Sequence, residues 1–264
     1  MTAALFVWAI AAVAQSPGAA SYERANRLFV DQKFQEALAA VDDALHRDPK
    51  LVPALTLKAK LAMAGNRFDV ARESLERAIA TDPAAAYAHL LYGFQFYLGN
   101  ELQLAAPALE KARRLNPRDA RAALYLGLTY ESLGRTSEAA GLYDQAIRLE
   151  EAAGKPQAET LLTASRLLVL LDRLQDASRL IERAVKLEPD SREAHFEMAR
   201  LLLKKGDAAL AVREGEAALR LAAGSVTDRQ VHYLLIRACQ AAGQESQADR
   251  HAAALRTLDD SGKK

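Results

Sequence analysis

Apolar residues recur at helical spacing through most of the chain, and residues 119–154 show the pattern most clearly. Ala123, Leu126 and Tyr130 stand at i, i+3 and i+7, which places them on one face of an α-helix. Gly134 then interrupts the spacing, as glycine commonly does at the end of a helix. A second helical set follows it, made of Ala139, Tyr143, Ala146 and Leu149. The segment therefore predicts two amphipathic helices joined by a short turn.

The same two-helix pattern returns with a period of about 34 residues, which is typical of a repeat protein. Two short insertions, Gly154–Gln157 and Val226–Asp228, interrupt the period. The first insertion predicts that the second helix of the fourth repeat is about one turn longer than its equivalents. The predicted repeats are residues 18–51, 52–85, 86–119, 120–153, 158–191, 192–225 and 229–258.

The spacing resembles that of the tetratricopeptide repeat, W-x2-L-G-x2-Y followed by A-x3-F and a closing P. In residues 120–153 it reads A-x2-L-G-x2-Y and then A-x3-Y-x2-A. The resemblance implies an all-α fold, a right-handed superhelical α-solenoid of antiparallel helix pairs, over residues 21–258. It also implies a protein that binds other proteins.

Small residues and prolines support this register on physical grounds. Alanine stands wherever the two helices of a repeat would cross, and a larger side chain there would overpack the contact at about 1–3 kcal/mol. Prolines end four of the second helices, because proline cannot continue a helix. Pro107 is different, since it falls inside a predicted helix, where it costs about 3 kcal/mol or forces a kink. The crossing alanines are Ala37, Ala71, Ala105, Ala139, Ala177, Ala211 and Ala248, and the terminal prolines are Pro49, Pro83, Pro117 and Pro189.

The N-terminal segment has a different composition from the repeats. Ala3–Ala14 is an uncharged apolar run that ends in Ala12-Val13-Ala14, a small-x-small pattern that resembles the cleavage site of a secretory signal peptide. We therefore expect a signal peptide at residues 1–14, a linker at 15–20 and a periplasmic or secreted mature chain. The alternative is a cytoplasmic adaptor in which this run is a structural first helix, although the run carries no charge. At the other end, residues 259–264 are expected to form a polar, frayed tail.

Composition and motifs favour a binding protein over an enzyme. The formal net charge is +1, so bulk electrostatics imply no nucleic-acid partner. The apolar N-terminal run is too short to span a bilayer comfortably, and we expect no stable membrane span once it has been cleaved off. Cys239 is the only cysteine, and the sequence contains no metal-binding, phosphate-binding or nucleophile motif of the common kinds. We expect no cofactor, no metal and no catalytic residue. His89, His195 and His232 share one repeat position, where they replace the large ring of the family at a helix contact.

One face of the first helices is not needed for packing. Positions 2, 5, 9 and 12 of each first helix form this face, and in the family it lines the concave groove. Its central part is apolar and aromatic, and such patches usually mark interaction sites. Its distal part carries arginines at one position of three consecutive repeats, with Glu159 and Glu193 two turns away. The candidate groove residues are Leu90, Phe94, Tyr97, Leu124, Leu128, Arg166, Phe196, Arg200, Tyr233 and Arg237. The same positions also hold Tyr22, Asn26, Phe29, Thr56, Lys60, Met63, Tyr87, Arg121, Glu131, Glu159, Leu162, Val169, Glu193, Leu203, Gln230 and Gln240.

These features predict an exported, non-catalytic scaffold that binds a protein or peptide segment in its groove, in the assembly of an envelope complex. The arginines predict a grip on acidic side chains or on a C-terminal carboxylate, because the guanidinium binds carboxylates in a bidentate fashion. The alternative is a solvated groove of mixed charge that binds no partner at this surface. An enzyme that uses the groove as a substrate cleft is the third reading, and it lacks a base–nucleophile pair in the sequence.

Overall fold

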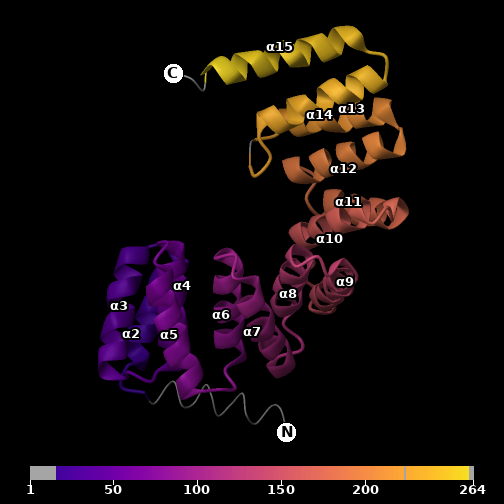
Figure 1. The fold of residues 1–264 in the computed structure, drawn as a ribbon. Helices are drawn as coiled ribbons and strands as arrows, with labels where there is room; N and C mark the ends of the chain where they lie inside the picture. The colour runs from indigo at the N-terminus through magenta and orange to yellow at the C-terminus, as the bar shows by residue number, and fades with distance from the viewer. Residues whose placement is uncertain (1–15, 223, 262–264) are drawn as a thin grey trace. The chain divides into compact units, whose positions relative to one another are not determined.

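The computed structural model describes residues 16–222 and 224–261, and these residues form fourteen helices and no strand (Figure 1). The predicted all-α class and the antiparallel pairing of helices are confirmed. The predicted signal peptide lies outside the described residues. The helices are α2 (Ala19–Val30), α3 (Phe34–Arg47), α4 (Val52–Ala64), α5 (Phe68–Thr81), α6 (Ala86–Leu98), α7 (Leu102–Leu115), α8 (Ala120–Ser132), α9 (Thr136–Ala152), α10 (Ala158–Leu170), α11 (Leu174–Leu187), α12 (Arg192–Lys205), α13 (Ala208–Arg220), α14 (Asp228–Ala241) and α15 (Glu245–Ser261).

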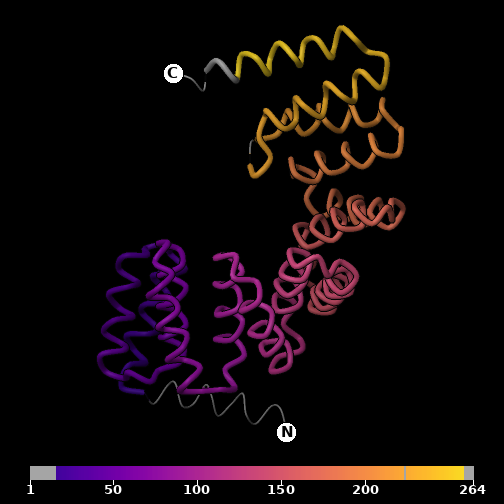
Figure 2. The backbone as a smooth tube through the Cα atoms, in the orientation of Figure 1, coloured from indigo at the N-terminus to yellow at the C-terminus, as the bar shows by residue number. Residues whose placement is uncertain are grey.

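The chain divides into two compact units, residues 1–142 and 143–264, and the boundary falls within α9. In each unit the chain passes from one helix hairpin to the next, and consecutive helices pack on one another from α2 to α8 in the first unit and from α10 to α15 in the second (Figure 2). Successive first helices also touch, as α2, α4, α6 and α8 do in the first unit and α10, α12 and α14 do in the second. The first helices of each unit therefore form one continuous row, and a ligand on that row would contact several repeats.

A residue in the left-handed backbone conformation joins the two helices of each described hairpin. Glycine occupies this position in three hairpins, and it adopts a positive φ without steric cost. In the other four the position holds a residue with a side chain, of which three are Asn or Asp, types that tolerate this conformation. The positions are Gln32, Asn66, Asn100, Gly134, Asp172, Gly206 and Gly243.

Four second helices end at a residue that precedes proline. Asp48, Asp82, Asn116 and Glu188 have φ between −139° and −133° with ψ between 80° and 95°, outside the helical region. The proline ring disfavours the helical conformation of the residue before it, so each helix stops there. The carboxylate or amide oxygens of three of these residues also accept a hydrogen bond from the backbone N–H two residues later.

The crossing alanines are buried as predicted. Six of the seven are completely buried, and Ala248 in the last hairpin is 5% exposed. Gly93 shows how close the helices come, because a Cβ placed on it would lie 2.5 Å from Cγ of Leu109 on α7. Small side chains at these contacts let the backbones approach, and this approach closes the hairpin.

Two predicted boundaries are wrong by a few residues. The predicted linker at 15–20 ends early, because α2 begins at Ala19. Ser16 fastens this start, since its hydroxyl lies 2.6 Å from Oδ2 of Asp48 and accepts a hydrogen bond from the backbone of Gly18. At the other end α15 continues to Ser261, into the predicted polar tail, because the helix meets no glycine or proline before Gly262.

The two irregularities of the sequence have modest local effects. Helix α9 runs for 17 residues, whereas α7 and α11 run for 14, so the predicted lengthening before Gly154 is confirmed. Pro107 lies inside α7, and the helix continues past it from Leu102 to Leu115. Its ring is exposed, and it borders a cavity of about 500 Å³ between α5, α6 and α7.

Candidate functional site

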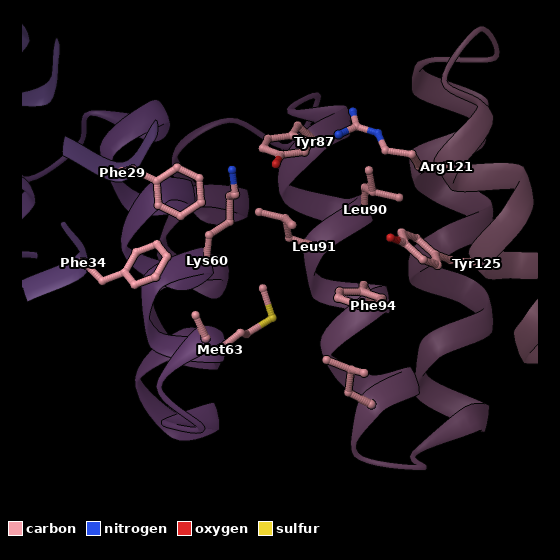
Figure 3. A pocket seen from close by; sticks show the side chains of 12 residues that line it. Phe29, Phe34, Lys60, Met63, Tyr87, Leu90, Leu91, Phe94, Arg121 and Tyr125 are labelled. Atoms are coloured by element: carbon pink, nitrogen blue, oxygen red, sulfur yellow. The ribbon is translucent and has the colours of Figure 1, made fainter. Parts of the chain in front are cut away.

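A cavity of about 500 Å³ opens on the first-helix row of the first unit. Its walls come from α2, α4, α6 and α8, together with Phe34 at the start of α3 (Figure 3). A volume of this size lies within the range of small ligand sites and suits a few side chains of a bound segment. The residues that line it are Phe29, Phe34, Lys60, Met63, Ala64, Tyr87, Leu90, Leu91, Phe94, Leu98, Arg121 and Tyr125.

Aromatic rings form two opposite walls of the cavity. Phe94 on α6 and Tyr125 on α8 stack with their ring centroids 4.4 Å apart, and Figure 3 shows them side by side. Phe29 and Phe34 form the other wall, with centroids 5.8 Å apart. Aromatic side chains offer large contact areas at a low entropic cost, so they commonly anchor bound partners.

Helix periodicity brings the α6 side chains together. Tyr87, Leu90, Leu91, Phe94 and Leu98 follow a spacing of three or four residues, so they share one face. The opposite face of α6 packs on α5 and α7 through residues such as Gly93 and Phe96. Leu98 is 49% exposed and Leu90 only 2% exposed, so the face runs from an open rim to a closed floor.

Two cations lie at the cavity. The Lys60 ammonium lies 4.2 Å from the centroid of the Phe29 ring, and the Arg121 guanidinium lies 5.1 Å from that of Tyr87 (Figure 3). Arg121 also makes two hydrogen bonds to the carboxylate of Asp119, with Nε at 2.9 Å from Oδ1 and Nη2 at 2.6 Å from Oδ2. These hydrogen bonds raise the pKa of Arg121 and fix its orientation.

The structure brings two of the five candidate residues of the first unit into the cavity. Leu90 and Phe94 line it, whereas Tyr97, Leu124 and Leu128 are half-buried and do not. Burial raises the pKa of Tyr97, and the nearby Glu131 raises it further.

Several residues that line the cavity do not stand at the helix positions from which the groove was predicted. Leu91 and Tyr125 stand at position 6 of their helices, and Ala64 and Leu98 stand at position 13. At 100° per residue these positions lie next to positions 2, 5, 9 and 12 on the same face. The helical period could therefore have identified them. Phe34 could not be found in this way, because it belongs to a second helix.

In the second unit, two of the three arginines share one buried acid. Glu197 on α12 is only 7% exposed, and its carboxylate accepts hydrogen bonds from Nη1 of Arg200 at 3.0 and 2.8 Å and from Nη1 of Arg166 at 3.5 Å. Nη2 of Arg166 also donates to the hydroxyl of Thr163. Helical spacing predicted this compensating role for Glu159 and Glu193, so the acid that performs it was missed.

Glu193 serves another purpose. It accepts hydrogen bonds from the hydroxyl and the backbone N–H of Ser225, both at 2.8 Å, and from the backbone of Val226. Burial alone would raise the pKa of Glu193, but these hydrogen bonds lower it below its usual value. Glu193 therefore holds the loop before α14 in place.

The remaining candidates of the second unit differ in exposure. Phe196 is half-buried and packs against the core of this unit, with the Arg200 guanidinium 6.0 Å from its ring. Tyr233 is 54% exposed. Arg237 is exposed and has no ion-pair partner within the part of the chain that the structure describes. The first-helix face of the second unit therefore presents the exposed guanidinium of Arg237 and the exposed phenol of Tyr233.

Two of the three histidines at the shared repeat position, His195 and His232, contact a side chain of the following helix, whereas His89 contacts the turn before its own helix. Nε2 of His89 lies 3.1 Å from the carbonyl of Pro83, and Nε2 of His195 lies 2.9 Å from that of Pro189. His195 also contacts the carboxylate of Glu214 through Nδ1 at 2.7 Å.

His232 instead meets His251 of α15, with the two Nδ1 atoms 3.1 Å apart. Burial lowers the pKa of both rings, and the neighbouring His232 lowers that of His251 further. This pairing was missed, because the two residues stand on different helices. Over residues 16–222 and 224–261, no group of three or more His, Cys, Asp and Glu is placed to hold a metal ion.

Repeated helix hairpins, buried alanine crossings and, within each unit, a continuous row of first helices define an α-solenoid repeat protein. More particularly, the chain belongs to the tetratricopeptide repeat family. One model of this repeat matches residues 28–92, and a second matches residues 95–156 and 162–226. None of the curated proteins matches the sequence significantly. Within the described ranges, no helix is long and apolar enough to cross a membrane.

Solved structures resemble the chain in fold. The APC/C hetero-tetramer Cut9–Hcn1 matches with a TM-score of 0.72 and 18% identity over 89% of this chain and 45% of that chain. A tetratricopeptide repeat protein from Parabacteroides merdae matches with a TM-score of 0.65 and 14% identity, over 91% of this chain and 93% of that chain. YrrB, described as a tetratricopeptide repeat protein with an unusual peptide-binding site, matches with a TM-score of 0.51 and 20% identity, over 66% of this chain and 88% of that chain. The chain spans less than half of the first of these chains, and identities this low show the fold alone.

Proposed function

We propose that this chain is a non-catalytic scaffold that binds a segment of another protein on its first-helix row, with the cavity of the first unit as the principal site. The observation that carries the proposal is the aromatic cavity formed by the first helices of four consecutive repeats, with the stacked Phe94–Tyr125 pair at one wall. A solenoid needs its second helices and crossings for packing, whereas this face remains open. Proteins of the family are generally adaptors without catalysis, which agrees with this reading.

A site-specific cross-linking experiment tests this proposal. A photoreactive phenylalanine analogue at Phe34, which is 45% exposed at the rim of the cavity, should cross-link to a partner protein. The same analogue at Leu210, which is also 45% exposed but lies on α13, is the control. Cross-links of equal yield at both positions would contradict the proposed site.

The affinity of the identified partner then gives a quantitative test. Phe94→Ala should weaken binding by about 1–3 kcal/mol, as is usual for an aromatic anchor. Phe68→Ala removes an aromatic residue of 36% exposure on α5, outside the cavity, and should leave the affinity unchanged. Equal losses in the two variants would point to general destabilisation.

The arginine-bearing first-helix face of the second unit is a second candidate surface. Arg237 is exposed without an ion-pair partner among the described residues, and Tyr233 is 54% exposed. If this surface grips acidic groups, Arg237→Ala should weaken partner binding by about 1–3 kcal/mol, and the loss should shrink at high salt. Arg220→Ala, an exposed arginine on α13, is the matched control. Unchanged affinity in Arg237→Ala would remove this surface from the site.

We propose further that the scaffold is exported and acts in the assembly of an envelope complex. The apolar run Ala3–Ala14 and the Ala12-Val13-Ala14 pattern support export. Cleavage after Ala14 would remove Trp8, the only tryptophan of the chain. The protein isolated from the envelope fraction should therefore have Gln15 as its N-terminal residue, which N-terminal sequencing measures. The mature protein should also show no tryptophan fluorescence. Trp8 in the mature protein would favour the cytoplasmic adaptor with a structural first helix.

A further inference from the structure

The charged residues that line the cavity are all positive. Among the described residues around it, two are cationic, Lys60 and Arg121, and none is acidic. The rest of the lining is aromatic or aliphatic apart from the phenol groups of Tyr87 and Tyr125. A bound segment would therefore meet an apolar surface whose two charged groups, Lys60 on α4 and Arg121 on α8, are both positive (Figure 3).

The two cations are not equivalent. Arg121 already has the carboxylate of Asp119 as a bidentate partner, so most of its charge is compensated. Lys60 is half-buried on α4 and has no carboxylate partner among the residues that the structure describes. Its ammonium faces the Phe29 ring at 4.2 Å, a contact that stabilises a cation without neutralising it.

A partly desolvated ammonium without a counter-charge is unfavourable, and an anionic group of a partner would relieve this cost. The neighbouring lining decides what must accompany the anion. Met63, Leu91 and Phe94 offer an adaptable apolar surface, since the Met thioether fits irregular shapes. A polar side chain would lose its water there without gaining a hydrogen bond.

We infer that the cavity recognises an internal protein segment in which an aspartate or glutamate stands close to a large apolar side chain. The carboxylate pairs with Lys60, and the apolar side chain lies against Phe94 and Tyr125. This inference rests on the proposed function, because it specifies the partner of the same site. The anion belongs to a side chain, so recognition needs no free C-terminus.

The experiment uses an array of short random peptides that are acetylated and amidated, so that no terminal carboxylate is present. The full chain should select peptides in which Asp or Glu neighbours Phe, Leu, Tyr or Trp. Lys60→Glu should reverse the selection toward Lys or Arg beside the same apolar residues. The substitution should also lower the affinity for the best acidic peptide by about ten-fold or more. Lys111→Glu, an exposed lysine on α7 outside this cavity, should select as the wild type does.

Each contrary outcome has a distinct meaning. Selection of apolar peptides without acids, unchanged in Lys60→Glu, would overturn the inference and leave the proposed function intact. Binding that appears only with a free C-terminal carboxylate would also overturn it. If no peptide binds, both the inference and the proposed function fail. A wild-type dimer that Phe94→Asp converts to a monomer would assign the cavity to a second copy of the chain and refute the inference.

Discussion

Glu197 holds Arg200 in place from a buried position, with its Oε2 at 2.8 Å and its Oε1 at 3.0 Å from Nη1 of that residue. The two stand three residues apart on α12, and the same carboxylate reaches Arg166 on α10. The side chain of Glu197 is 9% exposed, whereas both arginines are 45% exposed. One buried acid therefore links two repeats and reduces the repulsion between the two arginines.

Glu197→Gln should destabilise the second unit. The substitution leaves Arg166 and Arg200 close together without their shared counter-charge, and we expect a loss of about 1–3 kcal/mol in the free energy of unfolding. Urea unfolding of the variant measures this loss, and Glu182→Gln, an exposed acid on α11, is the control. A loss equal to that of the control would show that the ion pairs of Glu197 contribute nothing to stability.

Gly93→Ala and Gly141→Ala should change stability in opposite directions. A Cβ at Gly93 would collide with Leu109, so we expect a cost of about 1–3 kcal/mol from overpacking. Gly141 lies in α9 with nothing within 4 Å of the added Cβ, and alanine there should stabilise by about 0.5–1 kcal/mol through helix propensity. Thermal unfolding of the two variants checks the signs. A neutral Gly93→Ala would mean that α6 and α7 are less closely packed than described.

The left-handed hairpin positions allow a stabilising substitution. Gln32 has φ of 59° at a position that favours glycine, so Gln32→Gly should stabilise the first hairpin by about 1 kcal/mol. Gly134→Ala should destabilise by a similar amount, because Gly134 has φ of 76°, which alanine adopts only with strain. The space around Gly134 is open, so the added Cβ meets no neighbour and the cost comes from the backbone conformation alone. Chemical denaturation of both variants tests the pair. Changes of the same sign would show that the backbone conformation is not the cause.

The His232–His251 pair should make the second unit sensitive to acid. Burial lowers the pKa of both rings from 6.5. Asp228 raises the pKa of His232 and Arg192 lowers it, whereas the pKa of His251 is lowered by His232 and Arg250 and raised by Glu216. The folded state therefore binds protons less readily than the unfolded state. The stability that the pair contributes is present above pH about 6.5 and is lost as the pH falls through the lower pKa values of the folded state.

His251→Asn tests this linkage, because it removes one titrating ring and keeps a polar side chain. The thermal midpoint of the wild type should fall between neutral pH and pH about 5, and that of the variant should fall less. His46→Asn, an exposed histidine in the first unit, is the control. Parallel pH profiles for the wild type and His251→Asn would show that the pair does not couple folding to protonation.

The sequence by itself determined the repeat and its register. The spacing of Ala37, Ala71 and Ala105 could be read directly, because the place where two helices cross admits only a small side chain, and this requirement recurs in every hairpin. The same holds for the prolines after the second helices, which act on the residue before them. The helix that a residue belongs to and the face on which it stands are local properties, and the helical period supplies them.

The tertiary structure decided which side chains meet. Glu197 faces Arg166 of the preceding repeat, His251 faces His232, and Phe34 of a second helix joins the cavity of the first helices. None of these contacts follows from spacing, because each depends on the rotation and separation of packed helices. A turn of one helix by the angle between adjacent residues would replace the contacting side chain with its neighbour. The sequence therefore predicted a binding face, and the packing of neighbouring helices determined which residues form the cavity and which charges remain uncompensated.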